Sequence, residues 1–445
     1  MAAYSIRKKR LLLLAIGLLV MTTAFFAWRD WRVRSIPDLG EPFDVAAFEE
    51  KYPLDEPNAF NTYSRWLKVR DLIHQQNLSA NVNYNIAYDS WENANEATVE
   101  YLEEMRPLIG PWEEGSQIAQ GFEIDPREIS FESLLEVTQE SRDISRIILL
   151  DTARLMHEGD RKAVWDRYRL LMRIERHIRN GCLITQLVCY AMHKNWLSQF
   201  ERFLAQEEIT LEELRQFRDD LTRLQQQFPG PEVAIKFEYL GMRRTLAPKL
   251  AQHSWSNYLS NEPEVFQRVL SLFYRNWLAH CAKPPWEAPP FVEHQCATSQ
   301  IQSLLNQNDS ACRWDYFDDG TTSEDLLAAF HKPSYSQRYL NQFIPALKSC
   351  YRSMNSDRLY QQMALVQLGL HIYYRERGDF PEKLKDLIPD YIDELPRTPD
   401  ATGAVLTYTK TDTGREISSS DGKFLFNIYA PGTDLPSLFE PASNK

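Results

Sequence analysis

Hydrophobic residues follow two patterns along the chain. The first is an uncharged run of 18 residues from Leu11 to Trp28, which as a helix would span about 27 Å, close to the roughly 30 Å of a bilayer core. The second is a helical spacing of apolar residues between 133 and 228. It predicts antiparallel helical hairpins with short loops, with helices around 133–156, 164–178, 183–204 and 210–228.

Start and stop signals support these helices. Asp160 is a predicted N-cap directly after Gly159, and Asn180-Gly181 is a predicted helix end. Thr210 and Glu213 have the spacing of a capping box, and Phe228-Pro-Gly-Pro stops the last helix.

The C-terminal 90 residues carry a different pattern. An apolar stripe predicts a helix over 359–373 that ends at Gly378, and a short helix is predicted over 381–388. Strand-like segments follow near 404–410, 414–419 and 423–429, with turn residues between them. A helix packed on a small antiparallel meander is an α+β unit.

This unit resembles the globular part of the major pseudopilins of type II secretion. The residues that carry the resemblance are a helix-ending glycine, prolines, spaced leucines and aromatics, and late turn residues: Gly378, Phe380, Pro381, Leu384, Leu387, Tyr391, Leu395, Pro396, Pro399, Tyr408, Phe424, Gly432 and Asp434. The N-terminus lacks the prepilin cleavage signature, and about 330 residues separate the unit from the apolar run. The resemblance therefore implies a fold, not pilus assembly.

The whole layout resembles a set of uncharacterised bacterial proteins that have a single N-terminal anchor, a helical middle and a pilin-like tail. Gly159-Asp160 and Leu183-x-x-Gln186-Leu187-Val188 are matching stretches. We predict a mainly α fold with a transmembrane helix, a helical-hairpin ectodomain and a small α+β pilin-like module. The predicted parts are an anchor (1–34), a linker with a first helical part (35–125), a hairpin domain (126–278), an irregular Pro- and Cys-containing segment (279–335) and a helix plus module (336–445).

Charge is unevenly distributed along the chain. The formal net charge is −12, yet residues 1–34 hold seven Lys or Arg and one acid, which leaves −18 for the rest. An acidic body argues against nucleic-acid binding, which needs clustered Lys and Arg. We expect a retained single-pass anchor in the cytoplasmic membrane with the body on the exported side, and a cleaved signal peptide is the alternative.

If the body is exported, its six cysteines lie in an oxidising compartment. Cys182 and Cys189 lie seven apart on one predicted helix face, too far apart for a disulfide, so we expect buried free thiols. Cys281, Cys296, Cys312 and Cys350 fall in or beside the irregular segment. They allow three pairings, and we expect at least one disulfide among them.

Other candidate sites are weaker. His280, Cys281, His294 and Cys296 have spacing unlike common zinc pairs, and we interpret Asp315, Asp318, Asp319 and Gly320 as a turn rather than a calcium loop. We expect Glu238, Arg243 and Arg244 to form ion pairs on a helix surface. Trp255, Tyr258, Trp277 and Trp286 fit either a ligand cleft or, as we favour, the core.

No phosphate-binding, metalloprotease, nucleophile-elbow or redox-cysteine motif occurs in the sequence. We therefore expect no catalytic residue and no cofactor. The leading hypothesis is a non-enzymatic, membrane-anchored envelope protein that interacts with other envelope proteins. The alternatives are a component of a secretion or pilus-like machine and an envelope hydrolase whose site residues are scattered in the sequence.

Overall fold

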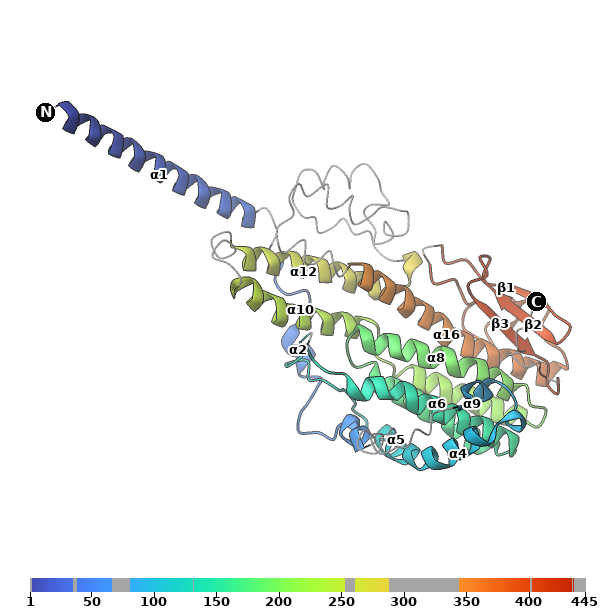
Figure 1. Ribbon diagram of the computed structural model, residues 1–445. Helices are drawn as coiled ribbons and strands as arrows, with labels where there is room; N and C mark the ends of the chain where they lie inside the picture. The colour runs from blue at the N-terminus through green and yellow to red at the C-terminus, as the bar shows by residue number, and fades with distance from the viewer. Residues whose placement is uncertain are drawn as a thin grey trace, which may run out of the picture. The chain divides into compact units, whose positions relative to one another are not determined.

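The computed structural model describes residues 2–34, 38–65, 81–130, 132–252, 261–287, 344–400, 402–433 and 435 (Figure 1). The chain forms two compact units. The first unit comprises 1–46, 239–280 and 289–348, and the second comprises 47–238, 281–288 and 349–445.

The first unit contains the apolar helix α1 (Ala2–Arg34). Its segment Leu11–Arg34 is long and apolar enough to cross a membrane, which is compatible with either a membrane anchor or a signal sequence. The Arg32 guanidinium lies 2.5 Å from the Glu262 carboxylate at the start of α12 (Glu262–Cys281). The chain after α1 is tied to α12 by Arg275, which donates to the carbonyls of Leu39 and Glu41.

The second unit is built on the four helices that the hydrophobic spacing predicts. They are α6 (Glu136–His157), α7 (Arg161–Ile178), α8 (Leu183–Leu204) and α9 (Leu211–Gln225). The predicted caps are confirmed: the Asp160 carboxylate accepts from the N–H of Ala163, and Thr210 and Glu213 form a capping box. Local sequence signals therefore determine where these helices begin.

Other helical elements precede and follow these four helices. They are α2 (Val45–Glu49), α4 (Glu96–Met105), α5 (Ile109–Ser116) and α10 (Glu232–Gln252), with 3₁₀ turns at Tyr84–Tyr88, Trp91–Asn93, Arg106–Leu108 and Pro285–Glu287. Large aromatic side chains fill the core of the second unit. There, the buried side chains of Tyr168, Trp196 and Phe200 pack against one another. Burial of such side chains is the main stabilising contribution.

The C-terminal part begins with one long helix, α16 (Ile344–Arg377). It extends the predicted 359–373 helix in the N-terminal direction, and Gly378 ends it with a φ of 80°, a conformation that favours glycine. The helix predicted over 381–388 is shorter, a single 3₁₀ turn at Leu384–Leu387. The buried side chains of Met363, Ala364 and Leu368 lie in the same core as those of α7 to α9.

The predicted antiparallel meander is confirmed. Strands β1 (Thr407–Lys410), β2 (Gly414–Ser418) and β3 (Leu425–Tyr429) form a sheet in the order β1-β2-β3 (Figure 1). Ile417 of β2 pairs with Tyr408 and Phe426. The Phe426 ring packs edge-on against Tyr360 of α16, with 5.6 Å between ring centroids. The sheet is thereby attached to the helical core.

Candidate functional site

The candidate site is a groove along α16 in the second unit, which we call the α16 groove. It consists of two adjoining hollows of about 590 Å³ each. One lies between α16 and the 282–287 segment, the other between α16 and α9, and the 389–399 segment contributes to both. Gln362, Leu365 and Glu394 line both hollows, so the two adjoin along α16. Each volume falls in the range of ligand-binding clefts.

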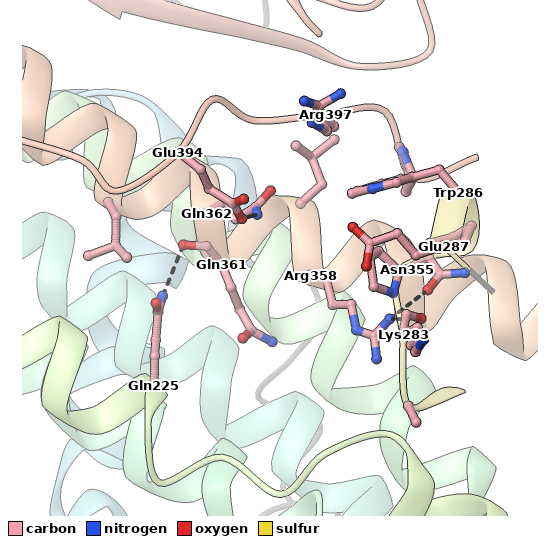
Figure 2. Close-up of a pocket in the computed structure, with 16 residues that line it drawn as sticks. Gln225, Lys283, Trp286, Glu287, Asn355, Arg358, Gln361, Gln362, Glu394 and Arg397 are labelled. Atoms are coloured by element: carbon pink, nitrogen blue, oxygen red, sulfur yellow. Dashed lines mark hydrogen bonds between the residues drawn. The ribbon is translucent and has the colours of Figure 1, made fainter. Parts of the chain in front are cut away.

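Arg358 positions one wall of the groove. Its guanidinium donates to the carbonyl of Cys281 at 2.5 Å and to that of Lys283 at 3.0 Å, and so holds the 281–287 segment against α16. Figure 2 shows the side chains of this segment and of α16 around the same hollow. Because α16 is anchored in the core, this wall of the groove is built on a rigid element.

Gly403 sets the position of Trp286 at the rim. A Cβ at this glycine would lie 2.6 Å from Cδ2 of the Trp286 ring, closer than side chains tolerate. Gly403 also has a φ of 53°, which disfavours other residues. Its carbonyl accepts from Arg397, another lining residue. Close packing at Gly403 therefore determines where Trp286 stands in the groove (Figure 2).

Glutamines give the groove its chemistry. Gln225 donates to the backbone carbonyl of Gln361, Gln361 donates to Asp357, and Gln362 donates to Glu394. These bonds use the amide N–H groups, which leaves the side-chain carbonyl oxygens without a partner among the described residues. Such oxygens accept from N–H donors of a ligand. Apolar surface from the partly exposed Leu365 lies beside them.

A buried charge cluster lies beneath the groove, and we call it the α7 cluster. Arg179 donates to both carboxylate oxygens of Asp357, at 2.6 and 3.1 Å. Glu175 accepts from the Trp196 indole at 2.9 Å and lies 3.2 Å from Nδ1 of His193. The guanidinium beside Asp357 lowers the pKa of that carboxyl although burial opposes the shift. All five side chains are buried.

A second buried pair joins α8, α16 and β3. Oε1 of Glu201 lies 2.9 Å from Nε2 of His371 and accepts the backbone N–H of Tyr429 at 2.8 Å. Burial raises the pKa of the Glu201 carboxyl, and His371 and the Tyr429 N–H act in the opposite direction. The second carboxylate oxygen, Oε2, has no hydrogen-bond partner in the described part of the chain.

Sequence reasoning missed both groups of charged residues. Their members are far apart in the sequence, for example Arg179 and Asp357, and none belongs to a recognisable motif. The available signal was the charge of Glu175 and Arg179 at helix positions next to the apolar stripe of 164–178. A charged residue inside such a stripe predicts a buried partner, although not which residue it is.

The structure describes four of the six cysteines. Cys182 and Cys189 are buried free thiols as predicted, and burial raises the pKa of both. Cys281 and Cys350 are also buried free thiols, with pKa values raised by burial to about 12 and about 11. Cys296 and Cys312 lie outside the described residues, so the disulfide expected within this set stays a prediction.

The remaining candidates fall in different places. His294 of the zinc candidate, the acidic set at 315–320 and the aromatics Trp255 and Tyr258 lie outside the described residues. Within the described ranges no group of three or more His, Cys, Asp or Glu side chains could hold a metal ion. Trp277 is in the core, whereas Trp286 lines the α16 groove.

The expected ion pairs of α10 differ in their partners. Arg243 pairs with Glu41, with 3.0 Å between nitrogen and oxygen. Glu238 is half-buried and accepts the backbone N–H of Leu183 at 3.0 Å, and burial raises the pKa of its carboxyl. Glu238 therefore caps the start of α8, where unpaired N–H groups attract a carboxylate.

Comparisons with protein-family models, with curated proteins and with solved structures found no match.

Proposed function

We propose that this protein is a membrane-anchored envelope protein of the non-enzymatic interaction type, and that the α16 groove binds an extended segment of another envelope protein. The observation that carries the proposal is that the two hollows adjoin along α16, where Gln362, Leu365 and Glu394 line both. A groove of two joined hollows suits an extended chain better than a single compact metabolite. The helix α1 would anchor the body as a single pass in the cytoplasmic membrane, with the body exported.

The lining supports recognition of a polypeptide. The unpartnered carbonyl oxygens of the glutamines match the backbone N–H groups of an extended segment, and Trp286 and Leu365 offer surface to its apolar side chains. Lys283 and Glu287 place both signs of charge at one rim. Mixed charge gives specificity for a partner segment more than raw affinity.

The same lining favours binding over hydrolysis. Among the described residues, neither hollow is lined by a histidine, serine or cysteine. The two buried histidine–carboxylate pairs of the second unit, at His193 and His371, line neither hollow. A hydrolase of the Ser–His or Cys–His type needs its nucleophile and its base within reach of the substrate.

Site-specific photocrosslinking tests the proposal. A photoreactive residue at Gln362, in the groove, should yield a protein adduct of defined mass in native membranes, whereas one at the exposed Glu103 of α4 should not. Gly403→Ala, which displaces Trp286, should lower the yield at position 362 at least several-fold while leaving the protein folded. Equal yields at both positions, or a yield unchanged by Gly403→Ala, would contradict the proposal.

A second candidate is a component of a secretion or pilus-like machine. It is favoured by the C-terminal arrangement of α16 and the β1-β2-β3 meander, which agrees with the helix and sheet expected from the resemblance to pseudopilins. Cells that lack the protein would then fail to export some substrate. Unchanged secretion would contradict this second candidate, and the groove-binding proposal would then stand by itself.

A further inference from the structure

A small cavity lies between α8, α16 and the outer edge of β3. Its volume is about 140 Å³, and its lining includes Lys194, Glu201, Gln367, Leu425, Asn427 and Tyr429. It is separate from the α16 groove, because the two share no lining residue. A cavity of roughly 150 Å³ holds a molecule the size of benzene. The β3 cavity, as we call it, can therefore hold one small residue of a peptide.

Unpartnered acceptors line the β3 cavity. Oε2 of Glu201 and Oε1 of Gln367 are both buried and have no hydrogen-bond partner in the described residues, and each residue is only 2% exposed. A buried carboxylate oxygen without a partner is costly, and a cationic donor would satisfy it. Glu201 cannot turn this oxygen away, because Oε1 is held by His371 and by the Tyr429 N–H. The pair of acceptors suits an ammonium group.

The edge of β3 supplies a second, independent feature. The N–H of Ala430 donates to the carbonyl of Thr413, and the carbonyl of Phe424 accepts from the N–H of Ser419, just outside the two ends of β2. By the same alternation, the even-numbered residues of β3 direct their backbone groups to β2. Odd-numbered residues then direct their N–H and C=O groups to the free edge, as the bond from Tyr429 to Glu201 confirms. At Leu425 and Asn427 these groups have no backbone partner among the described residues. An edge of this kind pairs with an added strand.

We infer that the β3 cavity and the adjoining edge form a docking site for the free amino terminus of an extended polypeptide. The terminal ammonium binds Oε2 of Glu201 and Oε1 of Gln367, and the first residue fills the cavity. The following residues pair with Leu425 and Asn427 as a fourth strand. Because Glu201 lies at the Tyr429 end of β3, the added strand runs antiparallel to β3.

Peptide capture by the purified full-length protein in detergent tests this inference. Two hexapeptide libraries carry a C-terminal fluorophore, begin with Gly, Ala or Ser and are random at the other five positions. One has a free amino terminus and the other is N-acetylated. The free library should be retained at least about tenfold more than the acetylated one, since acetylation removes the charge and its hydrogen bonds. Equal retention, or no retention of either library, would overturn the inference.

Two variants separate the two features. Glu201→Gln keeps an oxygen for His371 and Tyr429 but presents an N–H donor where Oε2 stood, so discrimination between the libraries should disappear. Asn427→Pro removes one outward N–H of β3 and should reduce retention of the free library to background. The matched control is Lys410→Pro. The N–H of Lys410 faces the opposite free edge of the sheet, so this variant should retain the free library as well as the unmodified protein does.

Thermal unfolding of each variant confirms that it is folded before capture is measured. Leu425→Pro replaces Asn427→Pro if the latter does not fold. If a variant with a proline in β3 still retains the free library, the added strand is refuted. If Glu201→Gln still discriminates fully between the libraries, the ammonium contact is refuted. Photocrosslinking at Gln362 does not involve these residues, so failure of this site and failure of the α16 groove are distinguishable.

Discussion

Helix α8 contributes to two buried histidine–carboxylate pairs, and they differ in how completely their oxygens are used. In the α7 cluster, both oxygens of Asp357 accept from Arg179, and both oxygens of Glu175 have close nitrogen partners. At Glu201 a single oxygen takes both hydrogen bonds while the other has none. The first arrangement is closed and the second is open to a cavity.

The difference separates stability from function. A buried cluster in which every carboxylate oxygen has a partner holds elements together, because removing one partner leaves an unpaired charge in the core. A carboxylate that keeps one oxygen unpaired beside a cavity carries a cost that a ligand can remove. The α7 cluster therefore fixes α7, α8 and α16 relative to one another, whereas Glu201 remains available to bind.

The largest expected effect comes from opening the closed cluster. Arg179→Met leaves the carboxylates of Asp357 and Glu175 buried without their cation, and we expect a loss of about 3–5 kcal/mol in the free energy of unfolding. Denaturant unfolding measures this loss. The double variant Arg179→Met, Asp357→Asn should lose less than Arg179→Met alone, because one stranded charge is gone. A larger loss in the double variant would contradict the pairing.

The two carboxyls should respond to pH with opposite sign. The pKa of Asp357 is lowered, so its stabilisation is complete above the ordinary value of about 4 and is lost as the pH falls through the folded-state pKa. The pKa of Glu201 is raised, so its stability is complete below the ordinary value of about 4.3 and is lost as the pH rises through the folded-state pKa.

Unfolding free energies measured between about pH 3 and 7 check these signs. Relative to the unmodified protein, Glu201→Gln should become more stable as the pH rises, because the glutamine carries no buried charge. The free energy of unfolding of Asp357→Asn should fall furthest below that of the unmodified protein at neutral pH. The difference should be smallest below about pH 4, where the unmodified protein also loses the ionised carboxylate. Differences that move in the same direction for both variants would show that the carboxyls do not differ as described.

The smallest effect should come from an exposed pair. Asp143 and Arg146 lie 2.9 Å apart on α6 with both side chains 47% exposed. Asp143→Asn should change the free energy of unfolding by no more than about 0.5 kcal/mol, because water screens the interaction. The same measurement as for Arg179→Met applies. A loss comparable with that of the buried variant would mean that charge alone, and not burial, determines the stability of these pairs.

Much of the fold could be predicted from local patterns. The N-cap at Asp160, the capping box at Thr210 and the glycine end at Gly378 act over a few residues and are confirmed. The positions of β1, β2 and β3 follow from alternation and turn residues. The helix predicted over 381–388 is too long, because a proline start does not distinguish a 3₁₀ turn from an α-helix.

The candidate sites could not be predicted in this way. The sequence favours the core for Trp286, yet this residue lines the α16 groove, where Gly403, over a hundred residues later, leaves room for its ring. Arg358 and the glutamines of α16 belong to no motif. Their roles depend on packing between segments, which the periodicity along one segment does not predict.

The sequence by itself determined the apolar N-terminal helix, the hairpin helices with their caps and the C-terminal meander, since each depends on residues that are neighbours in the chain. Only the tertiary structure decided which charges are buried and paired, which carboxylate oxygen is left open, and where the groove lies. Arg179 and Asp357 are 178 residues apart, and Glu201 and Tyr429 are 228 apart. Contacts over such separations arise from the folding of the whole chain. A long intervening loop lets each residue reach many partners, so the local sequence does not determine which one it contacts.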